Sequence, residues 1–250
     1  MEFIGQIQTV LAEIEQHEQA HILNAAEACS ASIKAGRAVL LFGAGHSALP
    51  AQEAFPRIGS IPGFVQITEP TLGFNGFVTG KGGQKQMSFL EGTPGFAAVI
   101  LANYDLTPAD TLIVFSNSGI NALPVELCGL ARQQGLTTIS VGSTAHSLAN
   151  QPKNPLGKRL LEVADIHIDN HVPAGDTLVT LDEGTLTGGG STIASMVIMN
   201  AIVVETLRIL RRAGVDIPVY PSHNVSANLE AVQSQEEAVF KAHKELISKL

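Results

Sequence analysis

Two strand-to-loop junctions constrain this chain more than any other feature. The first runs from Leu40 to Ser47 with the sequence LLFGAGHS, and the second runs from Leu112 to Asn121 with the sequence LIVFSNSGIN. Each passes from an apolar, strand-like run into small and hydroxyl-bearing residues, and then into a helical pattern. In α/β folds this arrangement presents backbone N–H groups to an anion. The sequence therefore predicts an α/β sheet with a site for an acidic small molecule.

Strand-like and helix-like patterns alternate along most of the chain. Short apolar runs bounded by turn residues are typical of strands that are buried on both faces. They occur at residues 38–42, 64–67, 112–115, 137–141 and 166–168. Helical spacing of apolar residues occurs at 3–34, 48–57, 89–103, 122–134, 192–212 and 229–250. The alternation predicts one doubly wound parallel sheet with right-handed crossovers.

Length and composition fit a single domain over residues 1–250. We expect an N-terminal helical segment at 1–35, an α/β core at 36–213 and a C-terminal extension at 214–250, because 250 residues with 45% hydrophobic content can bury one large core. No run approaches about 20 uninterrupted apolar residues. The first residues also lack the pattern of a signal peptide, so the expected location is the cytoplasm. A net charge of −8 argues against nucleic-acid and anionic-membrane partners. Cys29 and Cys128 are expected to be buried free thiols.

The first loop is weak evidence for a phosphate site when it is taken alone. Gly43 and Gly45 allow a ligand to approach the backbone, and Ser47 adds a hydroxyl. A dinucleotide fingerprint would need a third glycine, but Leu49 and Pro50 stand near its position. We therefore expect no nicotinamide or flavin cofactor.

The second loop favours an anion site more strongly. Ser116, Ser118 and Asn121 cluster after a buried strand, and hydroxyl-rich loops at helix N-termini suit phosphate oxygens without a lysine. Each loop taken alone also fits a plain turn with an N-cap.

The paired motifs FGAGHS (residues 42–47) and FSNSGIN (residues 115–121) resemble those of the SIS (sugar isomerase) domain family, which binds phosphosugars. The similarity to a bacterial branch of single-domain SIS proteins extends to Glu53, Arg57, TEP at 68–70, NYDL at 103–106, PLGKRL at 155–160 and ADI at 164–166. It covers roughly residues 22–224. The resemblance implies a three-layer, flavodoxin-like fold, with a five-stranded parallel sheet and helices on both faces. It also implies a homodimer or homotetramer with active sites near subunit contacts.

Three positions depart from the pattern of the family. Asn121 stands where the second loop usually ends in Ser or Thr, which keeps a donor but changes its reach. His171 and His223 stand where small residues are usual in that branch. These changes suggest a specialised ligand.

The resemblance implies an aldose–ketose isomerase that acts on an anionic sugar, phosphorylated or sulfonated, through a cis-enediol. This reaction needs a base that moves a proton between neighbouring carbons, and a carboxylate is the usual carrier in this family. Glu69 ends the second strand at the ligand-binding edge and is the favoured base, although it could also cap a neighbouring helix. Glu53 is the second candidate, but its spacing also fits an ion pair with Arg57.

Histidine suits the opening of a sugar ring because it titrates near neutrality. His46 and His223 are the best-placed catalytic candidates, and His171 is a candidate for binding. Ser191 and Thr192 follow the glycine run 188–190 and open the longest helix, where they would form a third wall of the site or a simple N-cap. Asp176 is a further polar candidate. The expected sugar-binding residues are Gly45, Ser47, Ser116, Asn117, Ser118, Asn121, His171, Ser191 and Thr192.

Two alternatives to the isomerase remain open. A lyase or etherase acting on an amino-sugar phosphate would also use a carboxylate base, but it would release a leaving group. A non-catalytic sugar-phosphate-binding protein would use the same loops without turnover. No metal site is expected, because the histidines lack ligand spacing. The irregular stretch 70–95, which contains Lys81 and Lys85, is either a lid or a packed insertion.

Overall fold

The computed structural model describes residues 1–73, 83–224 and 228–250. Its centre is a parallel sheet of five strands in the order β2-β1-β3-β4-β5. The strands are β1 (Val39–Gly43), β2 (Phe64–Gln66), β3 (Thr111–Phe115), β4 (Thr137–Gly142) and β5 (Ile166–Asp169). All five predicted strands are present, and the predicted α/β fold is confirmed. This strand order is the flavodoxin-like one, in which β1 lies between β2 and β3.

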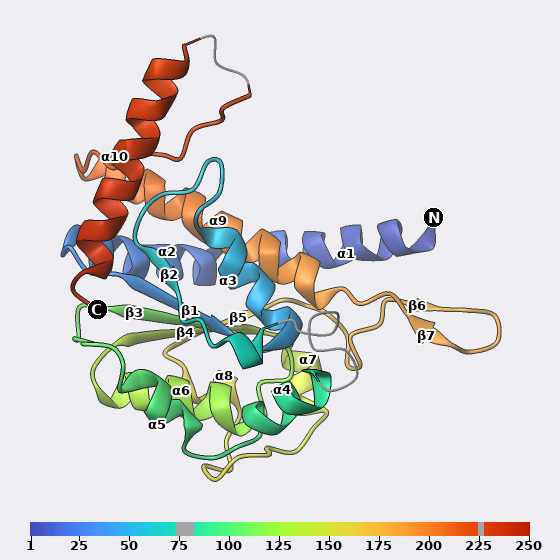
Figure 1. Ribbon diagram of the computed structural model, residues 1–250. Coiled ribbons are helices and arrows are strands. Elements are labelled where there is room, and N and C mark those ends of the chain that lie inside the picture. The colour runs from blue at the N-terminus through green and yellow to red at the C-terminus, as the bar shows by residue number, and fades with distance from the viewer. Residues whose placement is uncertain (74–82, 225–227) are drawn as a thin grey trace.

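Helices cover both faces of the sheet. In chain order they are α1 (Glu2–His17), α2 (Gln19–Lys34), η1 (Gly45–Ala48), α3 (Leu49–Ala54), η2 (Pro70–Leu72), α4 (Gly83–Glu91), α5 (Phe96–Leu101), α6 (Ala122–Gln133), α7 (Thr144–Leu148), α8 (Leu160–Val163), α9 (Ser191–Arg212) and α10 (Leu229–Ile247). Figure 1 shows α1, α2, α3 and α9 on one side of the sheet, and α5, α6 and α8 on the other. The expected three layers are therefore formed.

The strands alternate their side chains between two cores. Val39 and Leu41 of β1 face the core beneath α2 and α9, whereas Leu40 and Phe42 face the core beneath α5 and α6. All four side chains are buried. Because both faces are covered, β1 and β3 are nearly continuous apolar runs, whereas β4 and β5 also carry polar residues such as Ser140 and His167. Cys29 and Cys128 are free and buried, as predicted.

α9 is the central helix of one layer, and it packs against α2 and α3. Among the described residues it alone is long and apolar enough to cross a membrane. Core helices of soluble proteins share that length and composition, and Ile198, Met199 and Ile202 of α9 are buried in the core. Packing in the core therefore explains the apolar residues on the buried face of α9.

One predicted helix is wrong. The pattern over residues 89–103 predicts a single helix, but the structure has α4 and α5 with a break between them. Pro94 lacks an N–H group, and Gly95 has a left-handed backbone with φ 81°. These two residues end one helix and start the next. Residues 74–82, which include Lys81, lie outside the described residues, while Lys85 lies on α4.

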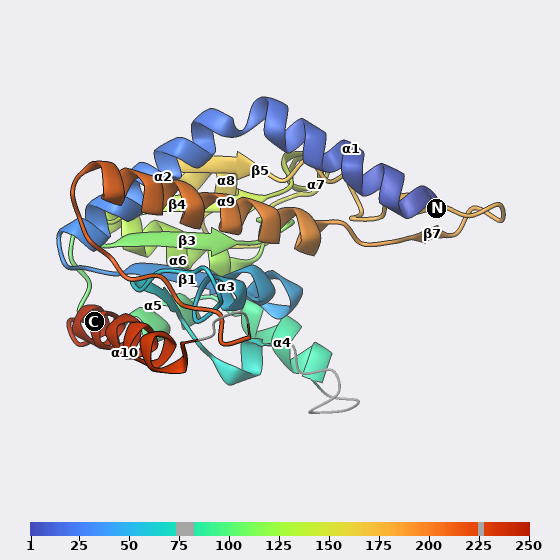
Figure 2. The ribbon, with the colours of Figure 1, turned by 90° about the horizontal axis from the view of Figure 1, so that it is seen from above.

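A small hairpin precedes α9 and is not predicted from the sequence. Its strands β6 (Val179–Thr180) and β7 (Leu186–Thr187) pair antiparallel and have only two residues each. Figures 1 and 2 show the hairpin extending from the body beside the N-terminal end of α1. Phe3 of α1 packs close to Gly188 at the base of the hairpin. The hairpin ends where α9 begins.

α10 packs beside the loop between α3 and β2. The ring of Phe55 in that loop stacks on His243 at a centroid distance of 4.2 Å, and Phe240 lies edge-on to Phe55. The chain end is also fixed, because Arg37 donates a hydrogen bond to the carbonyl oxygen of Lys249 across 2.7 Å. The C-terminal extension therefore stabilises the edge of the sheet near β2.

Candidate functional site

The candidate site is a small hollow at the carboxyl edge of the sheet. It lies where the loops after β1 and β3 meet, which is the point at which the strand order reverses. Ligands in open α/β sheets bind at this position. Its lining comes from three segments and consists of His46, Ser47, Pro50, Ser116, Asn117, Ser191, Thr192 and Ser195. The structure thus brings together both sequence motifs and the start of the longest helix.

The first wall is the loop after β1, and it requires glycine at two places. A Cβ atom on Gly43 would lie 2.0 Å from the carbonyl oxygen of Ser47, so only glycine allows the chain to turn back this tightly. Gly45 has a positive φ of 57°. The turn closes with a hydrogen bond from the backbone N–H of Ser47 to the carbonyl of Ala44 at 3.1 Å. This geometry brings His46 and Ser47 to the hollow.

The second wall is the loop after β3. The hydroxyl oxygen of Ser116 accepts a hydrogen bond from the backbone N–H of Gly119 across 3.2 Å, and Ser116 itself is buried. Gly119 has a positive φ of 60°. Asn121 is the N-cap of α6. The loop is therefore an internally bonded turn at a helix N-terminus, the arrangement suited to an anion.

Two neighbouring strands fix Asn117 in that loop. Asn170, which is fully buried after β5, donates its amide to the side-chain oxygen of Asn117 across 2.9 Å. The backbone N–H of Ser143, after β4, donates to the carbonyl of Asn117 across 3.0 Å. A Cβ atom on Gly142 would lie 2.2 Å from the carbonyl of Ser116, so glycine is needed for this close approach. The loop is held from behind by the ends of β4 and β5.

The third wall is the first turn of α9. Ser191, Thr192 and Ser195 face the hollow. Asp176 caps the helix, because its carboxylate accepts hydrogen bonds from the backbone N–H groups of Gly190 and Ser191 and from the hydroxyl of Ser191. This wall therefore presents hydroxyl groups next to a carboxylate.

The two carboxylates predicted as catalytic candidates, Glu69 and Glu53, have partners outside the hollow. Glu69 accepts hydrogen bonds from the hydroxyl and the backbone N–H of Thr71 at 2.7 and 3.3 Å. Glu53 forms an ion pair with Arg57. These two arrangements correspond to the capping and ion-pair alternatives that the sequence left open.

The histidine candidates lie on other elements. His223 lies 3.5 Å from the carboxylate of Glu236 on α10. His171 lies 3.0 Å from Glu18, a buried carboxylate at the junction of α1 and α2. Of the three candidate histidines, the structure brings only His46 to the hollow.

A second hollow borders the same loop after β3. Ser116 and Asn117 line both hollows, whereas Ser118 lines only the second. It also contains His167, whose two ring nitrogens lie 2.8 Å from the hydroxyl of Ser140 and 3.0 Å from that of Thr144. Burial lowers the pKa of His167 below its ordinary value. The ring, which belongs to β5, therefore bridges β4 and α7 beside the second hollow.

A partly buried carboxyl group lies near the end of the second loop. Glu91, at the end of α4, is hydrogen-bonded to Asn121, and burial raises its pKa above the ordinary value. Burial thus favours the uncharged form of Glu91 beside the loop suited to an anion.

Sequence analysis missed three residues that shape the site, namely Asn170, Ser195 and Glu91. Ser195 has a signal in the sequence, because it lies one helical turn after Ser191 and shares its face. Asn170 has a weaker signal, as part of a polar run at the end of a predicted strand. Glu91 has none, because its neighbour Asn121 is distant in the sequence.

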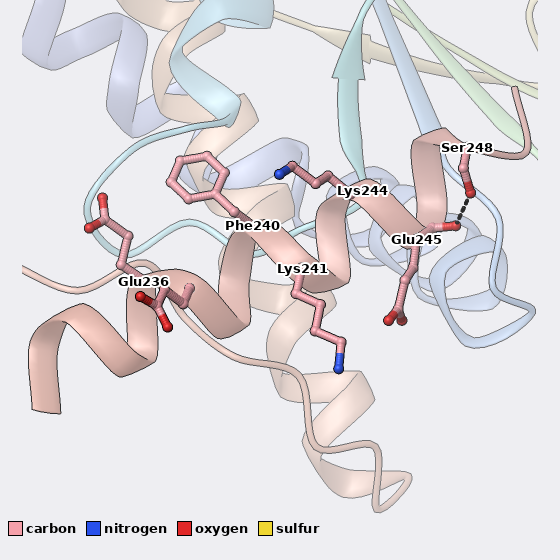
Figure 3. A pocket seen from close by; sticks show the side chains of 7 residues that line it. Glu236, Phe240, Lys241, Lys244, Glu245 and Ser248 are labelled. Carbon is pink, nitrogen blue, oxygen red and sulfur yellow. Dashed lines mark hydrogen bonds between the residues drawn. The ribbon is translucent and has the colours of Figure 1, made fainter.

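One further hollow is built by a single helix. The hollow shown in Figure 3 runs along α10 and is lined by Glu236, Glu237, Phe240, Lys241, Lys244, Glu245 and Ser248. All of these residues come from α10 or its C-cap. Within the described parts of the chain, no three His, Cys, Asp or Glu side chains gather so as to hold a metal ion.

The sequence and the fold are similar to those of known proteins. The family model of the SIS domain matches residues 2–143. A UPF0309 protein of Shouchella clausii is 32% identical over 220 residues, which cover 86% of this chain and 85% of that protein. A UPF0309 protein of Brucella anthropi is 35% identical over 210 residues, which cover 82% of this chain and 81% of that protein.

Two solved structures show the same fold. A phosphoheptose isomerase of Francisella tularensis has a TM-score of 0.53 at 18% identity and covers 82% of this chain and 93% of that chain. The NanR protein of Vibrio vulnificus, solved in complex with ManNAc-6P, has a TM-score of 0.53 at 15% identity and covers 96% of this chain and 67% of that chain. At these identities the likeness concerns the fold alone.

Proposed function

This chain belongs to the SIS domain family, and from that premise we propose that it is an aldose–ketose isomerase acting on a sugar with a terminal phosphate or sulfonate. The observation that carries the proposal is the convergence of three hydroxyl-bearing walls at the reversal point of the sheet. Hydroxyl groups both donate and accept hydrogen bonds, so this lining suits a sugar with several hydroxyls.

The anion is assigned to the loop between β3 and α6. Ser116 and Ser118 carry hydroxyl donors there, and Asn121 stands at the start of α6, a helix of 12 residues. The N-terminus of a helix favours negative charge. Ser47 faces this loop across the hollow. Phosphate and sulfonate oxygens both accept hydrogen bonds, so the same donors serve either group.

The proton transfer is assigned to Glu69. As base, it takes the proton from the carbon next to the carbonyl, while the carbonyl oxygen gains a proton to give a cis-enediol. The neighbouring hydroxyl then loses its proton as Glu69 returns the carbon-bound proton to the former carbonyl carbon. Glu69 follows β2, the strand beside β1, and so stands at the edge of the sheet where the hollow lies. Both bonds from Thr71 reach Oε1 of Glu69, and we assign the proton transfer to Oε2. His46 lines the hollow and is the group assigned to ring opening.

The remaining catalytic candidates receive lesser roles. Glu53 and His223 are engaged with Arg57 and Glu236, so we assign them no proton transfer within the chain that carries them. The proposal includes a homodimer or homotetramer, as the family implies. Light scattering after size-exclusion chromatography measures that state.

A non-catalytic sugar-phosphate-binding protein is the second candidate. The observation that favours it is the engagement of Glu69 with Thr71, which occupies one of its carboxylate oxygens. Binding by the loops would then need no base. A lyase acting on an amino-sugar phosphate is distinguished by its products, because it releases a group that an isomerase retains.

Product analysis tests the proposal. The purified chain is incubated with aldose and ketose forms of hexose and pentose phosphates and with a sulfonated hexose, and the mixtures are followed by NMR. Interconversion of an aldose and its ketose supports the isomerase. Release of a group from the sugar supports the lyase, and saturable binding without any conversion supports the binding protein.

A further inference from the structure

Asp176 occupies the N-terminus of α9 from within the chain. One carboxylate oxygen accepts the backbone N–H groups of Gly190 and Ser191 at 3.0 and 2.9 Å, and the other accepts the hydroxyl of Ser191 at 2.6 Å. Asp176 reaches this position with a positive φ of 57°. A non-glycine residue in the left-handed region costs free energy, so the surrounding contacts must maintain it.

The carboxylate changes what the α9 wall of the hollow can bind. A free helix N-terminus attracts anions through its N–H groups and its dipole. Here a negative charge already satisfies two N–H groups, one of them belonging to Ser191, which lines the hollow. A second anion at this wall would meet a like charge in a partly buried setting, where screening by solvent is weak.

The hydroxyl of Ser191 is also oriented by Asp176. Its hydrogen is donated to the carboxylate, so only its lone pairs remain for a ligand. A neutral sugar hydroxyl can donate to those lone pairs, whereas a phosphate or sulfonate has only acceptors to offer. Thr192 and Ser195 add two more neutral hydroxyls to the same wall.

The wall formed by the loop after β3 differs from the α9 wall in the charge that it favours. The nearby carboxyl group of Glu91 is partly buried, and this burial raises its pKa. The loop from Ser116 to Asn121 leads into the N-terminus of α6, which favours negative charge, whereas the N-terminus of α9 already holds the Asp176 carboxylate. The two ends of the hollow differ in the charge that they accept.

We propose that Asp176 is a specificity-determining residue that keeps a second anionic group away from the α9 wall. The site then takes sugars with one anionic end, bound at the loop after β3, and a neutral hydroxyl chain, bound at Ser191, Thr192 and Ser195. Sugar bisphosphates and phosphorylated sugar acids are excluded. This inference rests on the proposed function, because it assigns the two ends of the same sugar site.

The test compares monophosphates with bisphosphates of the same sugar. Calorimetry measures the Kd of fructose 6-phosphate and fructose 1,6-bisphosphate, of glucose 6-phosphate and glucose 1,6-bisphosphate, and of ribulose 5-phosphate and ribulose 1,5-bisphosphate. We expect the wild-type chain to prefer the monophosphate of any pair that it binds by about tenfold or more, the scale of one unpaired like-charge contact. The variant D176N keeps the oxygen acceptor for the N–H groups and removes the charge.

In D176N we expect the preference to fall by about tenfold, through tighter binding of the bisphosphate. The matched control is D182N, which removes the same charge from an exposed position in the hairpin before α9. It should leave the preference unchanged. Circular dichroism and melting curves establish that both variants are folded.

Three negative results are possible, and each one overturns a stated claim. Equal binding of a monophosphate and its bisphosphate by the wild-type chain overturns the role of Asp176, and this measurement needs no variant. An unchanged preference in folded D176N overturns it as well, while the sugar-phosphate site itself stands. The absence of binding by any probe instead overturns the proposed function on which this inference rests.

Discussion

Asn170 donates its side-chain amide to the side-chain oxygen of Asn117 across 2.9 Å, and this bond links the end of β5 to the loop after β3. The side-chain oxygen of Asn170 accepts the backbone N–H of Val172 at 3.1 Å, so both ends of its amide are engaged. Asn170 is fully buried. The loop assigned to the anion is therefore fixed before a ligand arrives, which reduces the entropy lost on binding.

Replacing Asn170 with alanine should loosen this loop. The change leaves the Asn117 oxygen and the Val172 N–H without their partner, so we expect a loss of about 1–3 kcal/mol in the free energy of unfolding. We also expect weaker sugar-phosphate binding, by about tenfold. Urea unfolding and calorimetry measure the two effects. The control is N200A, which removes an exposed amide from α9. Unchanged binding in folded N170A would contradict the role of this bond.

Gly142→Ala should distort the same loop by steric contact. The added methyl group would lie 2.2 Å from the carbonyl of Ser116, so either β4 or the loop must move. Overpacking of this kind costs about 1–3 kcal/mol, and displacement of Ser116 should weaken sugar-phosphate binding. The control is G5A, because a Cβ atom at Gly5 meets nothing within 4 Å and alanine favours a helix. Normal stability and binding in G142A would show that the loop does not depend on this approach.

Ser118→Ala should mainly weaken binding. The variant removes a hydroxyl donor from the loop assigned to the anion, and the base at Glu69 is untouched. We expect Kd and KM to rise by about tenfold while kcat changes little, the pattern of a lost binding contact. Steady-state kinetics with calorimetry gives this separation. S234A on the exposed face of α10 serves as control. A fall in kcat with no change in binding would contradict the assignment.

His167 should make the fold less stable in mild acid. Its pKa is lowered in the folded chain by burial, whereas in the unfolded chain it stays near 6.5. Below pH 6.5 the unfolded chain therefore binds a proton that the folded chain excludes. Stability falls as the pH drops from 6.5 toward the folded pKa, by at most about 1.4 kcal/mol per pH unit for this one group.

The variant H167N removes that contribution, so its stability should depend less on pH between 7 and 5. Urea unfolding across this range, for wild type and H167N, measures the difference. H17Q on the exposed face of α1 is the control. Parallel pH profiles for wild type and H167N would mean that the buried ring accepts its proton without cost.

Much of the fold could be predicted from the sequence because its determinants are local. The central strands, such as Leu112 to Phe115, are continuous apolar runs, and the glycines at 43 and 45 mark the turn that follows β1. The break between α4 and α5 cannot be predicted from the apolar spacing, because that spacing continues across Pro94 and Gly95. The hairpin before α9 could not be predicted, because strands of two residues are too short to show alternating apolar and polar residues.

The candidate site was predictable only in part, for a related reason. Ser47 and Ser116 could be expected to converge, because the carboxyl ends of parallel strands share one edge. The bond between Asn170 and Asn117 depends on two loops 53 residues apart in the sequence, and no local pattern encodes it. The partners of Glu53 and Glu69 lie close in sequence, so those contacts could be anticipated as alternatives.

Proton exchange in D2O tests the central claim most directly. Wild type, E69Q and the exposed control E183Q are incubated with each sugar of the panel, and deuterium at the carbon beside the carbonyl is followed by NMR. We expect exchange with ketose formation in wild type and E183Q. In E69Q we expect exchange to fall by about 10²–10⁴-fold, while the Kd for the same sugar changes little. Full exchange in E69Q would contradict its role as base. No exchange in wild type, with saturable shifts in melting temperature, would contradict the isomerase and indicate a binding protein.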